Sequence, residues 1–453
     1  MSLPALIEII PLDKAVEAEI AVPGSKSITN RALVLAALAE GETILRGALW
    51  SEDTQVMVDG LRQLGFTVEV EADPDDGCNR AISVHGLGGA VPGGGTIEKP
   101  LSLFVGNAGT AARFLTTLTC LGRGIYRLHG VKRMHERPQR SLFAALRDLR
   151  YCIDSANDKL PANIHGGGPK PGATCCVSIA ESSQFASALL LCAKAGGWHV
   201  NVVGENSEES PYLSLTSALV KVFPFRGGDF QIEPDASSGT YFWGIDWLLR
   251  GVKATVGSVV RVANWPASGW QVDEQFPKFL PPPDRVSRRN QLGDGIMTLI
   301  VLAACKEQPP PPANPEGPAT ASLRSSGTVA SDLTSLRFQE TERVKALRTE
   351  LSRLVIEPGQ RIFEEGDSLR ILPCRFHGNP TEIETYKDHR MAMCFTILGL
   401  KVPGIKIKNP ACVNKTFPNF FQKLASPPPG GLGATLLDAA TRRPLDVDEL
   451  FAG

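Results

Sequence analysis

The feature that most constrains the fold of this chain is a pattern that recurs six times. Each copy opens with Ser, Thr or Asp beside small residues, and continues as an apolar run of helical length. A Gly or Pro turn and a short β-rich segment follow. A helix that is apolar around its whole circumference is buried on all sides, and the polar openings are typical N-caps. The copies begin at Ser25, Gly109, Ser182, Ser237, Gly293 and Asp388.

The repeat predicts an α/β protein with two domains of three units each. Amphipathic segments such as SEDTQVMVDGLRQLGF lie between the apolar runs and predict outer helices, while TVEVEA and VNVVG predict strands. If the buried helices converge, their N-termini form an anion site from backbone N–H groups and helix dipoles. The alternative is that polar caps on apolar helices are common and imply no repeat.

Two stretches rich in Pro, Gly and Ser interrupt the pattern, one at 309–330 and one at 426–453. Such composition is typical of flexible segments. We therefore expect a flexible insert and a flexible tail, and we expect a chain that ends near Ala425 to keep its activity within about threefold.

The composition of the 453 residues narrows the class of partner. Lys plus Arg total 47 and Asp plus Glu total 48, which gives a net charge of −1. That balance removes the electrostatic reason to expect binding to nucleic acid or to an anionic membrane, and no apolar run reaches membrane-spanning length. The ten cysteines form no CxxC pair and no zinc-ligand spacing. We expect no metal, and a reducing cytoplasm as the compartment.

Basic residues gather at the openings of the repeats, where an ordinary buried cap would avoid charge. Together they predict a cationic site for a small substrate that bears phosphate and carboxylate groups. For any one of them, a surface ion pair is an equally good interpretation. These residues are Lys26, Arg31, Arg113, Arg133, Arg137, Arg343, Arg390 and Lys415.

Two acidic residues stand among these cations, Asp294 at the fifth opening and Glu340 in QETER. Carboxylates in an anion-binding site are costly unless they transfer protons, so general acid–base roles are attractive. The alternative for Asp294 is a plain N-cap of the fifth apolar helix. Neither a Walker A motif nor a dinucleotide-binding glycine fingerprint occurs, so nothing supports a nucleotide cofactor.

Short motifs of the chain occur in an order that resembles one known family, the 5-enolpyruvylshikimate-3-phosphate synthases. The resemblance extends from about Glu8 to Leu424. It implies a two-domain enolpyruvyl-transferase fold, an inside-out α/β barrel with three βαβαββ-type units per domain. The implied domains are 1–23 plus 238–425 and 24–237, and 426–453 is the flexible tail. The motifs are PGSKSITNR, LFVGNAGTAARF, RMHERP, SSQFASALLL, EPDASS, QETER, DHRMAM and NKTFP.

The resemblance also implies an activity. Members of the family transfer the enolpyruvyl group of phosphoenolpyruvate to the 5-hydroxyl of shikimate 3-phosphate, and phosphate is released by addition and elimination. The step belongs to the shikimate pathway, which supplies chorismate and the aromatic amino acids, and it is the target of the herbicide glyphosate. We therefore expect a monomeric cytoplasmic transferase that uses no cofactor. Two alternatives are an enolpyruvyl transferase with another acceptor and a non-catalytic, ligand-binding relative.

Family roles carried to matching positions assign residues to each substrate. The catalytic residues would be Lys26, Asp294, which takes the proton of the attacking hydroxyl, and Glu340, which takes part in proton transfer at the methylene carbon. Shikimate 3-phosphate would be bound by Lys26, Ser27, Arg31, Ser182, Ser183, Gln184 and Asp294. Phosphoenolpyruvate would be bound by Lys26, Asn107, Gly109, Arg137, Gln184, Arg343, Arg390 and Lys415.

The chain departs from the family pattern at several positions. Gln339 stands where the family often has Lys, and Ser335 stands where it often has Asn, both near shikimate 3-phosphate. The segment 262–289 is rich in Trp and Pro and does not align with the family. At Gly109 the missing side chain is expected to leave open space for glyphosate beside the second apolar helix.

Overall fold

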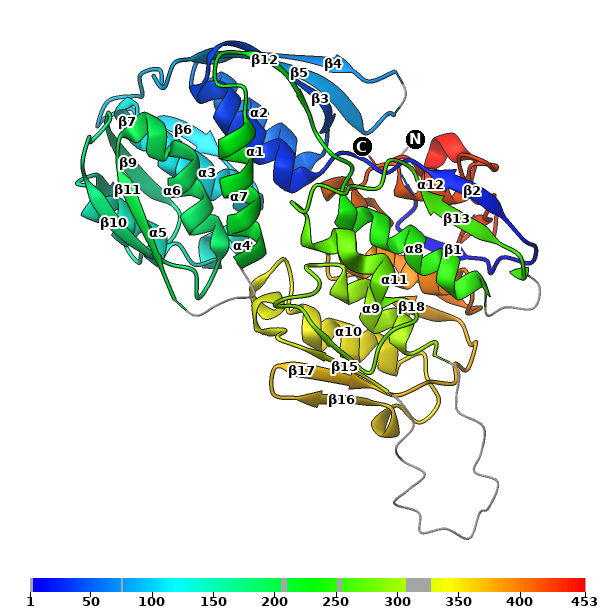
Figure 1. Cartoon of the computed structure of the whole chain (residues 1–453). Coiled ribbons are helices and arrows are strands. Elements are labelled where there is room, and N and C mark those ends of the chain that lie inside the picture. The colour runs from blue at the N-terminus through cyan, green and yellow to red at the C-terminus, as the bar shows by residue number, and fades with distance from the viewer. Residues whose placement is uncertain (1–2, 75, 205–209, 251–254, 307–326, 453) are drawn as a thin grey trace. The chain divides into compact units, whose positions relative to one another are not determined.

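The computed structural model describes residues 3–74, 76–204, 210–250, 255–306 and 327–452, and its chain divides into two compact units (Figure 1). The terminal unit combines Met1–Val22 with Ala236–Gly453, and the central unit is Pro23–Asp235. The chain therefore passes from one unit to the other at two places. The expected domain limits of 23 and 237 lie one residue beyond Val22 and two residues beyond Asp235.

Short strands supply the sheets of both units. Those of the central unit are β3 (Glu40–Leu49), β4 (Thr67–Ala72), β5 (Asn79–Leu87), β6 (Leu101–Phe104), β7 (Arg123–His129), β8 (Cys152–Asp154), β9 (Ala162–Gly167), β10 (Thr174–Ser178), β11 (His199–Val203) and β12 (Gly228–Gln231). Those of the terminal unit are β1 (Leu6–Ile9), β2 (Glu17–Ile20), β13 (Val259–Val262), β14 (Arg285–Ser287), β15 (Thr328–Ser331), β16 (Ile362–Glu365), β17 (Ser368–Ile371), β18 (Thr381–Ile383), β19 (Ile405–Lys408) and β20 (Leu436–Asp438).

Four sheets of the described chain share one pattern, in which the first two strands run parallel and the next two pairings are antiparallel. Their strand orders are β12-β3-β5-β4 and β6-β7-β9-β8 in the central unit, and β14-β15-β17-β16 and β18-β19-β1-β20 in the terminal unit. Each unit also has one parallel pair, β10 with β11 and β2 with β13. The repeat seen in the sequence is thus a repeat of topology.

Each of the six parallel strand pairs in the described residues is associated with one apolar helix. The six predicted buried helices are therefore confirmed. Four of them connect the two strands of their pair, as in a βαβ unit, whereas α1 and α8 directly precede one strand of theirs. The three of each unit pack against one another. They are α1 (Lys26–Leu38), α3 (Gly109–Cys120) and α6 (Ser183–Gly196) in the central unit, and α8 (Ala236–Arg250), α9 (Ile296–Ala303) and α11 (His389–Gly399) in the terminal unit.

The remaining helices are mostly amphipathic or short. In α2 the apolar Met57, Val58 and Leu61 are buried, whereas the charged Asp59 and Arg62 are exposed, as predicted for an outer helix. The α-helices of this group are α2 (Glu52–Gln63), α4 (Lys132–Glu136), α5 (Arg140–Asp148), α7 (Ser210–Val222), α10 (Arg343–Ser352) and α12 (Phe420–Ala425). The 3-10 helices are η3 (Val272–Phe279), η4 (Thr334–Phe338), η5 (Pro358–Gln360), η6 (Pro410–Lys415) and η7 (Val447–Leu450).

The expectation of a flexible tail from 426 onward is wrong. Leu436–Asp438 forms β20, which pairs antiparallel with β1 through Ile9↔Leu436 and Ile7↔Asp438. Strand β20 completes the sheet that begins with β18, as β4, β8 and β16 complete the other three. Pro and Gly dominate only the first part of the tail, while its later leucines join the core of the terminal unit. The core leucines of the tail are Leu432, Leu436, Leu445 and Leu450.

The expected insert at 309–330 falls mainly on residues 307–326, which lie outside the described residues. Its last residues do not form a loop, because Thr328–Ala330 belongs to β15. That strand pairs with β14 and β17 in the middle of its sheet. The predicted C-terminal limit of the insert, residue 330, was therefore placed too far along the chain. No described helix combines the length and the apolar character that crossing a membrane requires.

Candidate active site

In the terminal unit, predicted site residues gather around the carboxylate of Asp294. Its Oδ2 lies 3.1 Å from Nε of Arg390, and its Oδ1 lies 3.7 Å from Nη1 of Arg343. A third guanidinium, that of Arg288, approaches Oδ1 to 3.4 Å. The side chain of Asp294 keeps 18% of its surface exposed, whereas those of Arg288 and Arg343 keep 1% each. The carboxylate is therefore accessible, and the cations that surround it are buried.

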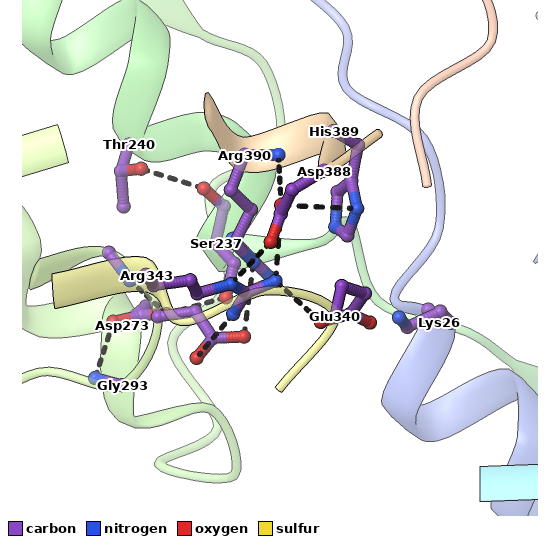
Figure 2. A network of polar contacts seen from close by, with 12 residues as sticks. Lys26, Ser237, Thr240, Asp273, Gly293, Glu340, Arg343, Asp388, His389 and Arg390 are labelled. Carbon is purple, nitrogen blue, oxygen red and sulfur yellow. Dashed lines mark hydrogen bonds and ion pairs between the residues drawn. The ribbon is translucent and has the colours of Figure 1, made fainter. Parts of the chain in front are cut away.

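Asp294 is not the N-cap of the fifth apolar helix. Gly295 precedes α9, and no side chain caps it. Instead Asp273, in η3, accepts hydrogen bonds from the Gly293 N–H at 2.7 Å and the Gly295 N–H at 3.1 Å, as Figure 2 shows for Gly293. Burial raises the pKa of Asp273, although the Ser237 hydroxyl donates to it at 2.5 Å. Because Asp273 satisfies the start of the helix, the plain-cap interpretation of Asp294 does not hold.

Arg343, the first residue of α10, connects the acidic residues of the cluster (Figure 2). Its Nη2 donates to Glu340 at 2.8 Å and its Nε donates to Asp388 at 2.8 Å. Burial opposes the charge of Arg343, but these two acids and Asp294 hold its pKa above the ordinary value. Asp388 is also the N-cap of α11 and accepts the N–H of Arg390 at 2.9 Å, so the same carboxylate places both arginines beside Asp294.

Glu340 lies between two cations. Besides its bond from Arg343, its Oε1 is 3.7 Å from Nζ of Lys415, which is buried at the end of η6. The predicted residues Asp294, Glu340, Arg343, Arg390 and Lys415 thus form one connected cluster. A second carboxylate within a group of cations is the arrangement that acid–base chemistry on an anionic substrate needs.

The cations decide the ionisation of Asp294. Burial by itself would raise the pKa of this carboxyl group, but Arg390, Arg343 and Arg288 outweigh burial and hold its pKa well below the usual carboxyl range. Asp294 is therefore ionised at neutral pH, and it can accept a proton.

Sequence reasoning missed Arg288 and Asp273, which both lie in the segment 262–289. Arg288 follows β14 and is buried, whereas its neighbour Arg289 is 40% exposed. In the sequence alone, two adjacent arginines look like two ordinary surface charges, and nothing distinguishes the buried one. The structure also shows what surrounds the substituted position Ser335. Its hydroxyl accepts a short hydrogen bond from Nη1 of Arg288, so that part of the cluster contains a cation that the motifs did not reveal.

In the central unit, the first helix carries Lys26 and Arg31. The ammonium of Lys26 lies 3.1 Å from Oδ2 of Asp53. Arg31 is 3% exposed, and its Nε donates to the Thr216 hydroxyl at 2.8 Å. Its Nη1 donates to the carbonyl oxygen of Ser27 at 2.9 Å. Arg31 therefore connects α1 with α7.

The start of α3 holds two arginines close together. Arg137 donates to the carbonyl oxygen of Asn107 at 3.1 Å, and Arg113 donates to that of Gly109 at 3.1 Å. Burial, together with the charge of Arg137, lowers the pKa of Arg113 well below its ordinary value. Since two neighbouring cations repel each other, an anion bound beside them would stabilise both.

The expected open space at Gly109 is already occupied. A Cβ atom at this position would lie 2.5 Å from Nη2 of Arg137 and 2.9 Å from Nη1 of Arg113. The absent side chain of Gly109 therefore leaves room for two guanidinium groups of the protein itself. An added methyl group would displace the flexible end of Arg137.

The third helix start of the central unit begins with Ser182, whose hydroxyl accepts the N–H of Gln184 at 3.2 Å. Ser183 is buried and Gln184 is half-buried. Side-chain capping by the first residue occurs here and at Asp388, but Ser25 makes no such bond at the start of α1. The polar openings therefore predicted where the helices begin better than how they are capped.

A separate group in the central unit comprises Cys152, Asp154 and His165, whose potential metal-ligand atoms lie within 4.8 Å of one another. Pairing of β8 with β9 places Cys152 opposite His165. Nε2 of His165 lies 2.7 Å from Asp154. Strand pairing creates this group, so the spacing along the chain could not reveal it, and none of the predicted site residues belongs to it.

Comparison with known proteins gives consistent results for sequence and fold. The family model described as EPSP synthase (3-phosphoshikimate 1-carboxyvinyltransferase) matches residues 11–226 and 288–424. A 3-phosphoshikimate 1-carboxyvinyltransferase of Rhizobium leguminosarum bv. trifolii (strain WSM2304) is 35% identical over 462 residues, covering 97% of this chain and 100% of the relative. One of Nostoc punctiforme is 34% identical over 458 residues, with 92% and 98% covered.

Solved structures of similar fold come from the same group of enzymes. An EPSP synthase from Acinetobacter baumannii aligns with a TM-score of 0.70 at 22% identity, covering 95% of this chain and 99% of that one. The enolpyruvyl transferase NikO from Streptomyces tendae aligns with a TM-score of 0.63 at 15% identity, with 96% and 99% covered. The repeated strand pattern, the six buried helices and these likenesses define an enolpyruvyl-transferase fold.

The sequence comparisons identify the family within that fold. Because the family model covers most of the chain and relatives above 30% identity align over nearly the whole of it, the chain belongs to the EPSP synthase family and is a transferase.

Proposed function

We propose that the chain transfers the enolpyruvyl group of phosphoenolpyruvate to the 5-hydroxyl of shikimate 3-phosphate, in the shikimate pathway to chorismate and the aromatic amino acids. Membership of the EPSP synthase family supports this reaction. The structural observation that carries the proposal is the carboxylate of Asp294, close to Glu340 and surrounded by buried arginines. A cluster of this kind suits proton transfer to and from substrates with several negative charges.

Proton transfer in the proposed reaction has two stages. In the addition, the 5-hydroxyl oxygen bonds to the central carbon of phosphoenolpyruvate, Asp294 takes the hydroxyl proton, and the methylene carbon gains a proton. In the elimination, the methyl group loses a proton, the double bond forms again, and the bond to the phosphate oxygen breaks. Glu340, held by Arg343 at 2.8 Å, is the group we assign to the proton exchange at carbon.

The charges of the cluster also explain how a carboxylate of low pKa can act as a base. In the structure, Arg343 and Arg390 stabilise the ionised form of Asp294. When the phosphate and carboxylate of phosphoenolpyruvate bind to Arg343, Arg390 and Lys415, the added negative charge opposes this stabilisation. The basicity of Asp294 then rises only when substrate is present, which limits proton uptake from water before the acceptor is bound.

We assign the central-unit residues to binding and positioning. Helix N-termini and cations attract phosphate. The proximity of Arg113 and Arg137 supports an anion near Gly109. The shikimate 3-phosphate group comprises Lys26, Ser27, Arg31, Ser182, Ser183 and Gln184, with Asp294 in the terminal unit. The phosphoenolpyruvate group comprises Lys26, Asn107, Gly109, Arg137 and Gln184, with Arg343, Arg390 and Lys415 in the terminal unit.

We further propose that the two compact units are the two domains and that the enzyme is a cytoplasmic monomer without a cofactor. The boundaries of the compact units, which fall after Val22 and after Asp235, support the two domains. Each of the ten cysteines, all of them in the described chain, is free, which fits a reducing compartment. Gel filtration coupled to light scattering tests the monomer, and an apparent mass of a dimer would contradict it.

A phosphate-release assay tests the reaction. The purified chain with phosphoenolpyruvate and shikimate 3-phosphate is expected to release phosphate and form the enol ether in equal amounts. Release with UDP-N-acetylglucosamine but not with shikimate 3-phosphate would indicate a different acceptor. Calorimetric binding of shikimate 3-phosphate without turnover would indicate a non-catalytic relative. Either result would contradict the proposed function.

Gly109→Ala is expected to weaken inhibition by glyphosate at least tenfold, about 1.4 kcal/mol. The added methyl group must displace Arg137 (2.5 Å from the Cβ position), so we also expect a higher KM for phosphoenolpyruvate. Steady-state kinetics with varied phosphoenolpyruvate and glyphosate measure both. Gly77→Ala is the matched control, because a Cβ there has no neighbour within 4 Å. An unchanged inhibition constant in Gly109→Ala would contradict the proximity of this position to the anion site.

A further inference from the structure

Arg288 is a buried arginine that lies outside the recognised motifs. The side chain of Arg288 is 1% exposed, and it belongs to the largest fully buried side chains of the described chain. Its backbone N–H donates to the Ser331 carbonyl at 3.1 Å, which fixes its main chain next to β15. Burying a guanidinium is unfavourable unless charged and polar groups surround it. The groups that contact Arg288 therefore indicate why the cation is there.

Arg288 joins two groups that lie far apart in the sequence. Nη1 donates a short hydrogen bond to the Ser335 hydroxyl in η4, and Nη2 lies 3.4 Å from Oδ1 of Asp294. The planar guanidinium therefore uses one nitrogen to hold itself in place and the other to contact the accessible carboxylate. A lysine has a single nitrogen and cannot make both contacts with the same geometry.

We propose that Arg288 is a positioning residue for Asp294, and that it holds Oδ1 of the carboxylate through its anchor at Ser335 so that Oδ2 can face the substrate hydroxyl. The proposal rests on the proposed function for the identity of the substrate. It adds a residue that lies outside the recognised motifs, and it assigns Ser335 to the support of Arg288.

The division of labour among the arginines supports this role. Arg343 is shared among Asp294, Glu340 and Asp388, and Arg390 lies 3.1 Å from Oδ2. Arg343 and Arg390 are also assigned to phosphoenolpyruvate, whose anions would draw them away from Asp294. Arg288 is not assigned to that substrate, so its contact with Oδ1 can persist throughout the reaction.

The charged groups that face Asp294 come from several elements. Arg288 follows β14, Arg343 opens α10, and Arg390 lies in the first turn of α11. Glu340 and Asp273 contribute negative charge. Removal of the Arg288 charge leaves the other four groups in place. The expected direction is therefore a higher pKa for Asp294.

Three variants separate charge from position. Arg288→Met removes both, and we expect kcat to fall about 10- to 100-fold, the usual range for a misplaced catalytic group, with the acid limb of the pH profile of kcat/KM moved to higher pH. Arg288→Lys retains the charge, so its acid limb should stay near that of the wild type while kcat remains low. Ser335→Ala removes the anchor alone and should lower kcat less, without moving the acid limb.

Arg289→Met is the matched control, because Arg289 is the next residue and is paired with Asp332 at 3.3 Å outside the cluster. Its kcat and pH profile should equal those of the wild type. Circular dichroism and melting curves establish that each variant is folded. If Arg288→Met does not fold, Arg288→Lys and Ser335→Ala carry the test, and wild-type kcat in both would overturn the proposal. A folded Arg288→Met with unchanged kcat and pH profile would also overturn it.

A measurement without turnover keeps this inference separate from the proposed function. The chain is labelled with ¹³C at the aspartate carboxyl carbons, and the Asp294 signal is assigned by its absence in Asp294→Asn. Its titration should move to higher pH in Arg288→Met and stay unchanged in Arg289→Met. Identical titration in Arg288→Met and wild type overturns the inference even if the wild type is active. An inactive wild type with the expected titration refutes the proposed function alone.

Discussion

Asp294→Asn is expected to lower kcat at least 100-fold, the usual scale for a positioned general base. The amide keeps the size of the side chain but cannot accept the proton of the attacking hydroxyl. Because the ion pairs with Arg343 and Arg390 lose their anion, binding of phosphoenolpyruvate should be unchanged or tighter. The loss should therefore appear in kcat and not as a higher KM, in steady-state phosphate-release kinetics.

The fold of Asp294→Asn should survive, because Asp273 and not Asp294 accepts the N–H groups at the start of α9. Asp332→Asn is the matched control. Asp332 also pairs with an arginine of the terminal unit, at 3.3 Å, but lies outside the cluster. Its kcat should stay within about twofold of the wild type. A folded Asp294→Asn enzyme with near-normal kcat would show that Asp294 is not the base.

A chain that ends at Ala425 is expected to lose the folded terminal unit. Burial of one leucine stabilises a protein by about 1.5–3 kcal/mol, and the tail buries Leu432, Leu436, Leu445 and Leu450 in the core. Together with the lost pairing of β20 on β1, this approaches or exceeds the total stability of about 5–15 kcal/mol that is typical of a domain. Expression of soluble protein and differential scanning calorimetry measure the loss.

A point substitution gives a graded version of the same test. Leu436→Ala should cost about 2–5 kcal/mol, as for other buried leucines. Thr435→Ala is its control, because Thr435 is exposed and adjacent to Leu436, so its melting temperature should match that of the wild type. A truncated chain that melts like the full chain would restore the interpretation of the tail as a flexible extension.

Local patterns in the sequence were sufficient to predict the buried helices and most charged groups of the site. A helix such as α9 or α11 is apolar on every face, and this property requires burial wherever the chain places it. The cations Arg343, Arg390 and Lys415 stood in recognisable motifs, and the structure places them in one cluster with Asp294 and Glu340. Their roles in catalysis stay a prediction that the variants above test.

Composition was a weaker guide than pattern. The tail has a Pro-rich start, but Leu436 and Leu450 are buried in the core of the terminal unit. Likewise, the start of β15 lies within a stretch that its composition assigned to a flexible insert. In both cases a few apolar residues at the right spacing outweighed the average character of the segment.

The sequence by itself therefore determined the repeated unit, the family and the local chemistry of the motifs, because helix burial and short motifs depend on neighbouring residues. Only the tertiary structure decided which distant groups meet. Strand β20 completes a sheet with β1 from the opposite end of the chain. Asp273 takes the helix-start role that was the alternative interpretation of Asp294, and Arg288 reaches both Ser335 and Asp294. Such pairings depend on sheet register and on the burial of charge against charge, and neither has a periodic signal along the chain.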